Sequence, residues 1–330
     1  MKVLNFGSLN MDYVYQVDHM TREGETQKAA GREAFPGGKG LNQSVAAARA
    51  GVEVYHAGLV GDDGQMLLDV CLENGIRADH IRRVDGPSGH TIIQIDKNAQ
   101  NSILLYPGSN GKVTKAFVDA VLASFGRGDL ILLQNEINRL DYIIDQAYEK
   151  GMTIVLNPSP ISEELLACDL AKVSVFLMNE IEGKAISGES DPDRIMDYMA
   201  RTYPDARTVL TLGGDGACYR DRCCQIRQRA YPVAAVDTTA AGDTFTGYVV
   251  YGILKGLPWA ETLELAAKAA AIAVTRKGAV PVSYTHLPQP ARSAPGRGEG
   301  HPGELGRPQR GAGPLGQPGG VPQRPDHRLL

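Results

Sequence analysis

Apolar positions along this chain follow two periods, one typical of strands and one typical of helices. From residue 114 onward the two periods alternate. Helices are expected at 114–125, 138–150, 163–168 and 191–203, and short apolar strands at 129–134, 153–157, 173–177 and 208–211. Nearer the N-terminus, strands at 3–7 and 52–59 alternate with helices at 41–50 and 66–74. Strands that alternate with helices indicate an α/β protein with a mostly parallel sheet covered by helices.

Two stretches depart from this alternation. At about 13–35, short alternating segments are interrupted by the polar residues 22–25, and at about 90–106 two strands flank a turn. A period of two without helical segments indicates antiparallel pairing. We expect these two stretches to pair with each other and to form a small sheet outside the main layer.

A run of small residues marks a corner at 237–247. It follows an apolar run at 231–236, expected to be a strand, and leads into an apolar helix. Ala240, Ala241 and Gly242 would let backbone N–H groups at the helix start approach an anion closely. Those groups lack intrahelical partners and lie at the positive end of the helix dipole. The corner therefore predicts an anion hole.

Asp243 follows this run and falls in the first turn of the expected helix. A carboxylate beside a phosphate site is repulsive, so it needs a role there. A general base that takes a proton from a hydroxyl attacking phosphorus fits the position. The alternative is an acidic residue that merely favours the helix dipole. The small-residue run and a second glycine-rich corner upstream favour the base.

Other polar residues gather where strands end, which is where open α/β sheets bind ligands. They are Asn10, Asp12, Glu136, Asn157, Asn179, Glu182 and Thr211 with Gly213, Gly214 and Gly216. Each has an ordinary alternative: Glu136 as a solvated loop acid, and Asn179 with Glu182 as a capping box. Their convergence on one edge of the sheet is stronger support than any single residue.

The second glycine-rich corner, Gly37-Gly38-Lys39-Gly40, lacks the spacing of a Walker loop. It suits a flexible turn over which a small polyol lies, with Lys39 and Asn42 as hydrogen-bonding groups. A simple turn is the alternative.

Composition narrows the functional classes. The formal net charge of −4 implies no broad basic face for nucleic acid. The five cysteines have no metal-site spacing, which favours a reducing compartment, and a redox role for the adjacent Cys223 and Cys224 is disfavoured because neighbours in a strand face opposite ways. No apolar run is long enough to span a membrane, and the first strand begins too early for a signal peptide. We expect a cytoplasmic protein.

Five motifs in order along residues 1–281 resemble the ribokinase (PfkB-type) family of carbohydrate kinases. They are Gly-Gly-Lys-Gly-Leu-Asn at 37–42, Asn179-x-x-Glu182, Thr-Leu-Gly at 211–213, Asp-Thr-Thr-Ala-Ala-Gly-Asp at 237–243 and Ala-Val-Thr-Arg-Lys-Gly-Ala at 273–279. The resemblance implies a three-layer α/β/α fold with a small β-sheet lid formed by about 13–35 and 90–106. It also implies a homodimer that pairs through the lid.

The resemblance further implies a role for each matching residue. Asp243 would be the base, with Ala240, Ala241 and Gly242 as the anion hole. The sugar would be held by Asn10, Asp12, Gly38, Lys39, Asn42 and Glu136. The ATP site would include Asn179, Thr211, Gly213, Gly214, Gly216 and Gly242, with Glu182 orienting the Mg²⁺ shell. A K⁺ site would use Asp237, Thr239, Ala273, Arg276 and Gly278.

The implied activity is ATP-dependent phosphorylation of the primary hydroxyl of a pentose, with D-ribose as the first candidate. The alternatives are a nucleoside or other-carbohydrate kinase of the same family, and a sugar-binding regulator without catalysis. The chain departs from the family after Pro281. Residues 282–330 are rich in Pro, Gly and Arg and show no periodicity, so we expect a disordered, non-functional tail. A basic interaction tail is the alternative.

Overall fold

The structure is a computed structural model that describes residues 1–98 and 100–276. All of these residues belong to one compact unit, Met1–Pro288. The expectations for 282–330 and for Gly278 lie outside the described residues. Within the described ranges, no helix is both long and apolar enough to cross a membrane.

The central sheet of the described residues has nine strands in the order β13-β12-β11-β10-β9-β8-β1-β4-β5. All neighbours pair in parallel except at one edge, where β12 is antiparallel to both β11 and β13. The strands are β1 Val3–Phe6, β4 Val54–Val60, β5 Arg77–Arg83, β8 Leu130–Gln134, β9 Thr153–Asn157, β10 Val175–Asn179, β11 Arg207–Thr211, β12 Ala217–Arg220 and β13 Gln225–Gln228. The expected α/β class with a mostly parallel sheet is confirmed.

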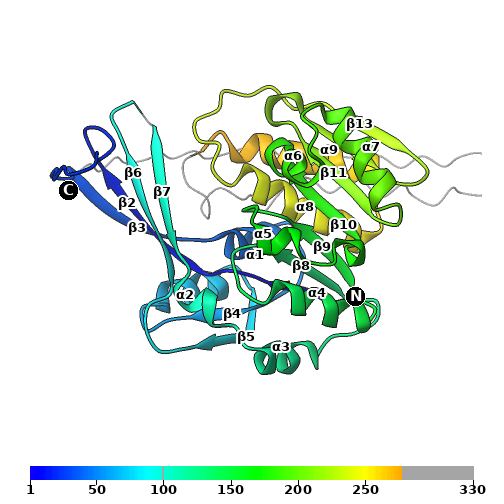
Figure 1. The fold of residues 1–330 in the computed structure, drawn as a ribbon, viewed down its shortest axis with the longest axis horizontal. Coiled ribbons are helices and arrows are strands. Elements are labelled where there is room, and N and C mark those ends of the chain that lie inside the picture. The colour runs from blue at the N-terminus through cyan, green and yellow to red at the C-terminus, as the bar shows by residue number, and fades with distance from the viewer. Residues whose placement is uncertain (99, 277–330) are drawn as a thin grey trace, which may run out of the picture. The chain divides into compact units, whose positions relative to one another are not determined.

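Helices cover both faces of this sheet, which makes the three layers (Figure 1). They are α1 Lys39–Arg49, α2 Gln65–Glu73, α3 Lys115–Leu122, α4 Leu140–Glu149, α5 Glu163–Leu166, α6 Glu180–Ser187, α7 Pro192–Thr202, α8 Ala241–Lys255 and α9 Trp259–Ala273, with short 3₁₀ turns η1 Gly108–Lys112, η2 Leu170–Lys172 and η3 Gly213–Asp215.

Alternating side chains of the strands supply two separate cores. Leu4 and Phe6 of β1 belong to a buried cluster with residues of α3, α4 and α7. Val3, which precedes Leu4 and points to the opposite face, belongs to a second cluster with residues of α1, α2, α8 and α9. Strands buried on both faces explain why these segments read as continuous apolar runs.

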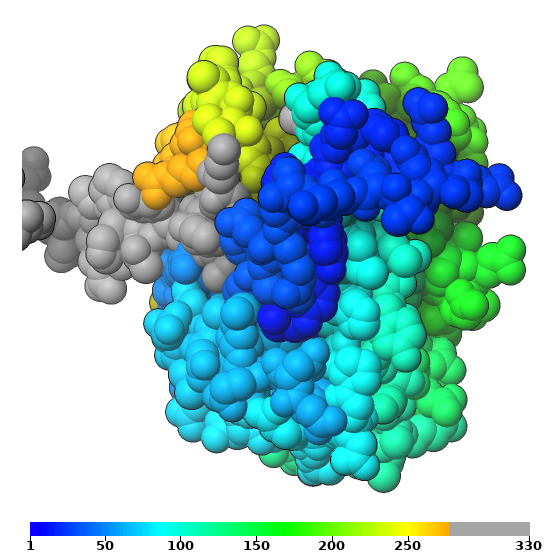
Figure 2. All heavy atoms as spheres, turned by 90° about the vertical axis from the view of Figure 1, so that its left-hand side faces the viewer, coloured from blue at the N-terminus to red at the C-terminus, as the bar shows by residue number. Residues whose placement is uncertain are grey.

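The lid is a separate small sheet, four-stranded within the described residues, in the order β3-β2-β6-β7. Its strands are β2 Asn10–Gln16, β3 Gly31–Gly37, β6 Gly89–Ile95 and β7 Asn101–Tyr106. The two expected hairpins, β2–β3 and β6–β7, are antiparallel, and they join through parallel pairing of β2 with β6. The lid stands beside the main sheet in Figure 1, and in Figure 2 its blue strands lie across the face toward the viewer.

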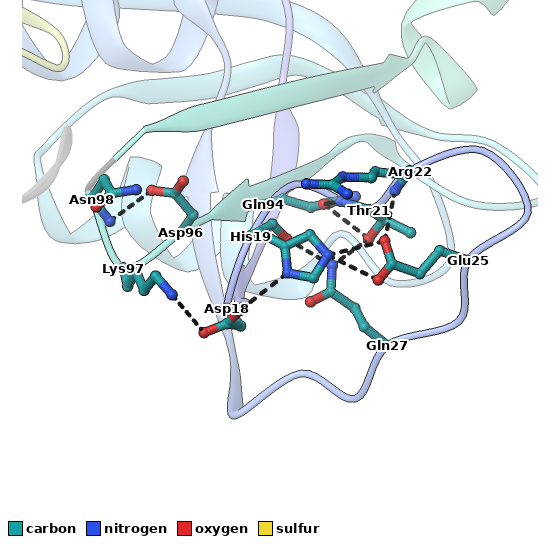
Figure 3. Close-up of polar contacts among 10 residues, drawn as sticks. All are labelled: Asp18, His19, Thr21, Arg22, Glu25, Gln27, Gln94, Asp96, Lys97 and Asn98. Atoms are coloured by element: carbon teal, nitrogen blue, oxygen red, sulfur yellow. Dashed lines mark hydrogen bonds and ion pairs between the residues drawn. The ribbon is translucent and has the colours of Figure 1, made fainter.

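The turn between β2 and β3 carries a polar cluster at the tip of the lid (Figure 3). His19 Nδ1 lies 3.1 Å from Asp18 Oδ2, and His19 Nε2 lies 2.8 Å from Glu25 Oε1. Hydrogen bonds with Asp18 and then Glu25 raise the pKa of His19. Lys97, from the turn between β6 and β7, lies 3.2 Å from Asp18, so it links the two hairpin turns.

The structure differs from the expected elements at three places. Residues 231–236 form no strand, because the N–H groups of Val236 and Asp237 donate to the carbonyl of Val274 after α9 rather than to a neighbouring strand. The edge strand β5 was missed, because its sequence, with three arginines, is largely polar and an edge strand buries little. Strand β10 begins two residues later than the expected 173–177.

Helices α1 and α8 approach each other closely at Gly247. A Cβ built on Gly247 would lie 2.6 Å from the Cβ of Ala46 and 2.6 Å from the backbone N of Ala47. Both neighbours are on α1 and neither can swing away, because one is backbone and the other is a Cβ. Glycine at this position therefore sets the distance between the helix that carries Lys39 to Gln43 and the helix that carries Asp243.

We expect Gly247→Ala to destabilise the fold by about 1–3 kcal/mol, because the extra methyl group overpacks the α1–α8 contact. Helix propensity alone would make the same change stabilising, by up to about 1 kcal/mol. The sign of the change in unfolding free energy, measured with chemical denaturant, decides between the two. Gly126→Ala is a control for the general effect of replacing a glycine, because Gly126 lies outside the helices and a Cβ there would meet nothing within 4 Å.

Candidate functional site

Asp243 lies in the first turn of α8, buried with a 7% exposed surface, and lines a cavity of about 200 Å³ at the carboxyl ends of the strands. The preceding corner turns at Ala240, whose φ of 58° is in the left-handed region. Helix α8 begins at Ala241, and the N–H of Thr244 donates to the carbonyl of Ala240 at 2.8 Å. The small residues Ala240 and Gly242 line the same cavity as Asp243, so the helix start and the carboxylate face one space.

Two neighbouring side chains of α1 hold the carboxylate of Asp243. Gln43 Nε2 donates to Asp243 Oδ1 at 2.9 Å, and Asn42 Nδ2 donates to Asp243 Oδ2 at 3.1 Å. The other polar atom of Asn42, Oδ1, is buried and has no hydrogen-bond partner among the described residues. A buried acceptor without a partner costs free energy, so a ligand hydroxyl that donates to it would be favoured.

Lys39 lines the same cavity and faces three carboxylates. Burial by itself lowers its pKa, but the charges of Asp243, Glu136 and Glu182 outweigh burial and leave the pKa raised. Lys39 is therefore a fixed positive charge. Its charge offsets part of the negative charge of Asp243, Glu136 and Glu182.

A second group of polar residues lies where the lid meets the main sheet. Asn10, at the start of β2, accepts a hydrogen bond at Oδ1 from Asn110 Nδ2 at 2.6 Å. Glu136 Oε2 accepts from the hydroxyl of Ser8 at 2.5 Å and from the backbone N–H of Lys39 at 2.9 Å. Burial raises the pKa of Glu136. These bonds bring Asn10, Glu136 and Lys39 from separate elements to one region, as expected from their positions at strand ends.

Gly38 joins this group by close approach. Its φ of 90° is in the left-handed region, and a Cβ there would lie 3.0 Å from Ser8 Oγ and 3.1 Å from the backbone N of Asn10. A side chain would therefore be strained and crowded at this corner.

Asp12 is the acid of the lid in this group. Its Oδ1 accepts from the hydroxyl of Thr91 on β6 at 2.6 Å, and a Cβ on Gly37 would collide with its Oδ2. Burial raises the pKa of Asp12 to about 6, although the bond from Thr91 acts in the opposite direction and the charge of Glu136 adds to the rise. Asp12 is therefore an acceptor whose charge changes near neutral pH.

A larger cleft of about 840 Å³ lies on the other side of the α8 start. It shares Thr211, Gly242 and Phe245 with the cavity of Asp243, so the two spaces are adjacent. Its walls contain Gly213, Gly214, Gly216, Tyr231, Pro232, Val233, Ala235, Ala267, Ala270, Ala271 and Val274. Apolar walls with glycines among them suit an aromatic base.

Asn179 and Glu182 form a complete capping box at the start of α6. The side chain of Asn179 accepts from the N–H of Glu182 at 3.0 Å, and Glu182 Oε2 accepts from the N–H of Asn179 at 2.8 Å. The structural alternative is therefore confirmed. Both residues also line the cavity of Asp243. Glu182 is 5% exposed, so its charge is directed into the site rather than into solvent.

The expected cation residues are described in part. Asp237 Oδ1 accepts from the N–H of Thr239 at 2.8 Å, and the carbonyl of Val274 accepts from the N–H groups of Val236 and Asp237 at 2.7 and 3.1 Å. The carbonyl of Ala273 accepts from the N–H of Arg276 at 3.2 Å. The end of α9 is thus tied to the loop before the start of α8, while Gly278 lies outside the described residues.

Sequence reasoning missed a set of buried amides behind Asp243, namely Asn5, Gln43 and Gln134, and the buried amide of Asn110 beside Asn10. Gln43 follows Asn42 in the same glycine-rich motif, and it lies deeper than Asn42 on α1. A glutamine inside an alanine-rich, apolar helix segment was a signal that could have pointed to it, because a buried amide needs partners.

Comparison with known proteins places the chain in a family. Residues 1–285 match the pfkB family of carbohydrate kinases. The chain belongs to this family. A ribokinase of Haemophilus influenzae is 33% identical over 285 residues, which cover 83% of this chain and 92% of that protein.

Solved ribokinase structures share the fold. A ribokinase of Cryptococcus neoformans in complex with ADP superposes with a TM-score of 0.77 at 27% identity, covering 86% of this chain and 97% of that chain. A ribokinase of Arabidopsis thaliana complexed with ribose and ATP superposes with a TM-score of 0.75 at 27% identity, covering 86% and 95%. The nine-stranded sheet with its lid, counted over the described residues, is therefore the fold of this family.

If Asp12 accepts hydrogen bonds from a sugar hydroxyl, the KM for the sugar should rise as the pH falls through about 6. Protonation replaces one acceptor by a donor, and the rise is expected on the acid side because the carboxylate is the binding form. Initial rates at varied sugar concentration between about pH 5 and pH 8 measure it. Asp12→Asn should raise the KM above about pH 6, where the unmodified carboxylate is charged, and remove this dependence. An unchanged acid-side rise in that variant would assign the titration to another group.

Proposed function

We propose that this pfkB-family kinase transfers the γ-phosphoryl group of ATP to the primary hydroxyl of D-ribose, giving D-ribose 5-phosphate. The observation that carries the proposal is the position of the buried Asp243 carboxylate, between the polar group of Asn10, Asp12 and Glu136 and the apolar cleft beyond Gly242. The ribokinase relatives, and the ribose and ATP complex of one of them, support the choice of sugar and phosphoryl donor.

On the sugar side, the chain offers acceptors and donors suited to a polyol. Asn10, Asp12 and Glu136 present acceptors, Asn42 presents its unpartnered Oδ1, and Gly38 allows close approach of the ring. Several fixed hydrogen bonds to hydroxyl groups orient the sugar so that its primary hydroxyl meets Asp243. Orientation of this kind is a large part of catalysis in phosphoryl transfer.

On the nucleotide side, the apolar cleft suits the adenine ring, and Thr211 with Gly213, Gly214 and Gly216 forms its edge. The phosphates would then reach the start of α8, where N–H groups without intrahelical partners and the helix dipole favour negative charge. Asn179 lines the adjoining cavity, where it would contact the phosphates.

In the transfer step, Asp243 takes the proton of the primary hydroxyl as the oxygen attacks phosphorus. The new O–P bond forms while the bond from the γ-phosphorus to the β–γ bridging oxygen breaks, and ADP leaves. The N–H group of Gly242 would stabilise the charge that develops on the transferring group, whereas the N–H of Ala241 donates to the carbonyl of Thr238 at 3.3 Å. Lys39, held positive by the surrounding acids, offsets the charge of Asp243 beside the phosphates.

Glu182 fits a role in the shell of Mg²⁺. Its carboxylate lines the cavity, and each oxygen accepts one hydrogen bond from Asn179, which leaves lone pairs for a metal-bound water. Within the described residues, no group of three or more His, Cys, Asp or Glu side chains is placed to hold a metal ion. An ion held through waters and ATP phosphates suits such a site, and it would neutralise phosphate charge.

A K⁺ site beside the anion hole fits Asp237 with backbone carbonyls of Thr239, Ala273, Arg276 and Gly278. A carboxylate with several carbonyl oxygens suits a hard cation, and the loop before the anion hole is already fastened to the end of α9 through Val274. A bound cation would fix the backbone of Thr239 to Gly242 without touching the substrate.

We further propose that two copies associate through their lids. Side chains on β7 that include Ile103, Leu104, Leu105 and Tyr106 are exposed, although strands of a sheet edge usually avoid such residues. A second lid that covers β7 would bury them. The kinase domain would then comprise residues 1–281, with 282–330 outside the catalytic unit.

A nucleoside or another carbohydrate is the second candidate substrate within the same family. An ADP-release assay over D-ribose, 2-deoxy-D-ribose, hexoses and nucleosides distinguishes them by kcat/KM. A nucleoside preferred over all free sugars would replace ribose as the assigned substrate.

We expect Asp243→Asn to lower kcat by roughly 10²–10⁴-fold while sugar and nucleotide still bind, because an amide cannot accept the proton. Steady-state kinetics and calorimetric titration with sugar measure the two effects. Asp141→Asn is the matched control, because Asp141 also lies in the first turn of a helix, α4, and is exposed. Comparable turnover in Asp243→Asn with an intact fold would return Asp243 to the role of a helix-dipole partner.

We expect activation by K⁺ over Na⁺ at fixed ionic strength, and loss of that difference in Asp237→Ala. The reason is that an aligned anion hole needs the loop from Thr239 to Gly242 to be fixed before charge develops. Rates in the two salts measure it, with Asp205→Ala, an exposed acid paired with Arg222, as control. Equal rates in both salts for the unmodified protein would remove the cation site from the proposal.

A further inference from the structure

Behind Asp243 lies a chain of buried polar side chains that the reaction itself does not use. Gln43, Gln134, Asn5, Ser44 and His56 are each fully buried and joined by hydrogen bonds. They come from α1, β8, β1 and β4, so the chain runs through the sheet to the helix that faces the base. Buried polar groups are costly unless they are paired, which makes such a chain unusual where apolar packing would serve.

The direction of each amide in this chain is fixed by its neighbours. Asn5 Nδ2 donates to the carbonyl of Gly40 at 2.7 Å, and a backbone carbonyl can only accept. The amide oxygen of Asn5 therefore faces Gln134, whose Nε2 donates to it at 3.1 Å. The second hydrogen of that group goes to Gln43 Oε1 at 2.7 Å. Gln43 is thereby left with its amino group toward Asp243.

A second anchor fixes Gln43 from the opposite side. Asn157 Nδ2 donates to the carbonyl of Leu177 at 2.9 Å, so its Oδ1 is turned toward Gln43 and accepts from Gln43 Nε2 at 2.9 Å. Both anchors impose the same orientation. The cost is visible at Gln134, whose Oε1 is buried without a partner among the described residues.

The far end of the chain is neutral. Asn5 Nδ2 also donates to Ser44 Oγ at 2.8 Å, and Ser44 Oγ lies 2.7 Å from Nδ1 of His56. Burial lowers the pKa of His56 to about 4, so the ring is neutral. Ser44 and His56 thus complete the pairing of Asn5, and neither is hydrogen-bonded to Asp243.

We propose that Gln43 is a positioning residue for the base: its amide, locked by the carbonyls of Gly40 and Leu177, pins Oδ1 of Asp243 so that Oδ2 meets the sugar hydroxyl. Oδ1 is bonded to the fully buried Gln43, whereas Oδ2 is bonded to Asn42, which belongs to the sugar-binding group. Oδ2 is therefore the atom that takes the proton. This inference rests on the proposed role of Asp243 as the base.

The test compares variants of Gln43 that keep its volume but change its hydrogen bonding. Gln43→Met removes the donor, and Gln43→Glu replaces it by an acceptor that faces Asp243. Both are expected to lower kcat by about 10-fold or more, the size of effect typical for a hydrogen bond to a charged group, while the KM values for ribose and ATP change by less than about 3-fold. A carboxylate has nearly the shape of the amide it replaces, so a loss of kcat in Gln43→Glu is not explained by packing.

Ser44→Ala is the matched control. Ser44 is the next residue on α1, equally buried and part of the same chain, but its loss leaves the bond from Asn5 to Gly40 and the orientation of Gln43 in place. It should lower the melting temperature and leave kcat within about 2-fold, since it removes one buried hydrogen bond away from the base. Where Gln43→Met does not fold, Gln43→Asn keeps the amide but shortens its reach, and it is expected to lower kcat in the same way.

The outcomes separate the two proposals. Loss of kcat in the Gln43 variants, with Ser44→Ala near the unmodified protein, supports the positioning role. An unchanged kcat in Gln43→Met or Gln43→Glu, or an equal loss in Ser44→Ala, overturns it. When the Gln43 variants keep their kcat but Asp243→Asn is inactive in the same assay, only the positioning role of Gln43 is overturned. An active Asp243→Asn overturns the role of Asp243 as the base.

Discussion

The site depends on one buried carboxylate at the start of a helix. Asp243 is 7% exposed, and a buried charge needs fixed partners because the interior solvates it poorly. The partners come from α1, where Asn42 and Gln43 donate hydrogen bonds to its two oxygens. Lys39, on the same helix, is also buried, and burial alone would lower its pKa. The charges of Asp243 and the neighbouring acids outweigh burial and raise that pKa. The α1–α8 contact at Gly247 is close enough for these bonds to form. The close packing of α1 against α8 is therefore also what brings the partners of the Asp243 charge into place.

The remaining elements place polar side chains around Asp243. The parallel strands end at one edge of the sheet, and this brings Asn157, Asn179 and Thr211 to the walls of the Asp243 cavity. The lid adds Asn10 and Asp12 from β2, a strand that does not belong to the nine-stranded sheet. An apolar cleft and a polar pocket consequently meet at the start of α8, where a phosphoryl group passing between nucleotide and sugar would lie.

The buried amides behind Asp243 show how a fold fixes the orientation of a side-chain amide. An amide can turn by 180° without changing its shape, so a single glutamine beside a carboxylate would not fix which group faces it. The backbone carbonyls of Gly40 and Leu177 can only accept hydrogen bonds, so they fix the orientation of the Asn5 and Asn157 amides that donate to them. Asn157 bonds Gln43 directly and Asn5 bonds it through Gln134, and these bonds fix the orientation of the Gln43 amide. Most atoms of the network are paired, and pairing is the condition under which buried polar groups rigidify a core.

The sequence by itself determined much of this protein. Period-two and helical patterns identified the alternating α/β elements and the lid hairpins, because side-chain burial repeats with the geometry of each element. Small residues before Asp243 identified the helix-start corner, because they leave the N–H groups at the helix start open to an anion. The sequence did not reveal β5, because the polar residues of this strand reflect an exposed edge. It also predicted a strand at 231–236 that does not form, because the N–H groups of Val236 and Asp237 donate to the carbonyl of Val274. Only the tertiary structure decided that Gln43 lies against Asp243, 200 residues apart, because no local pattern records which buried amides meet.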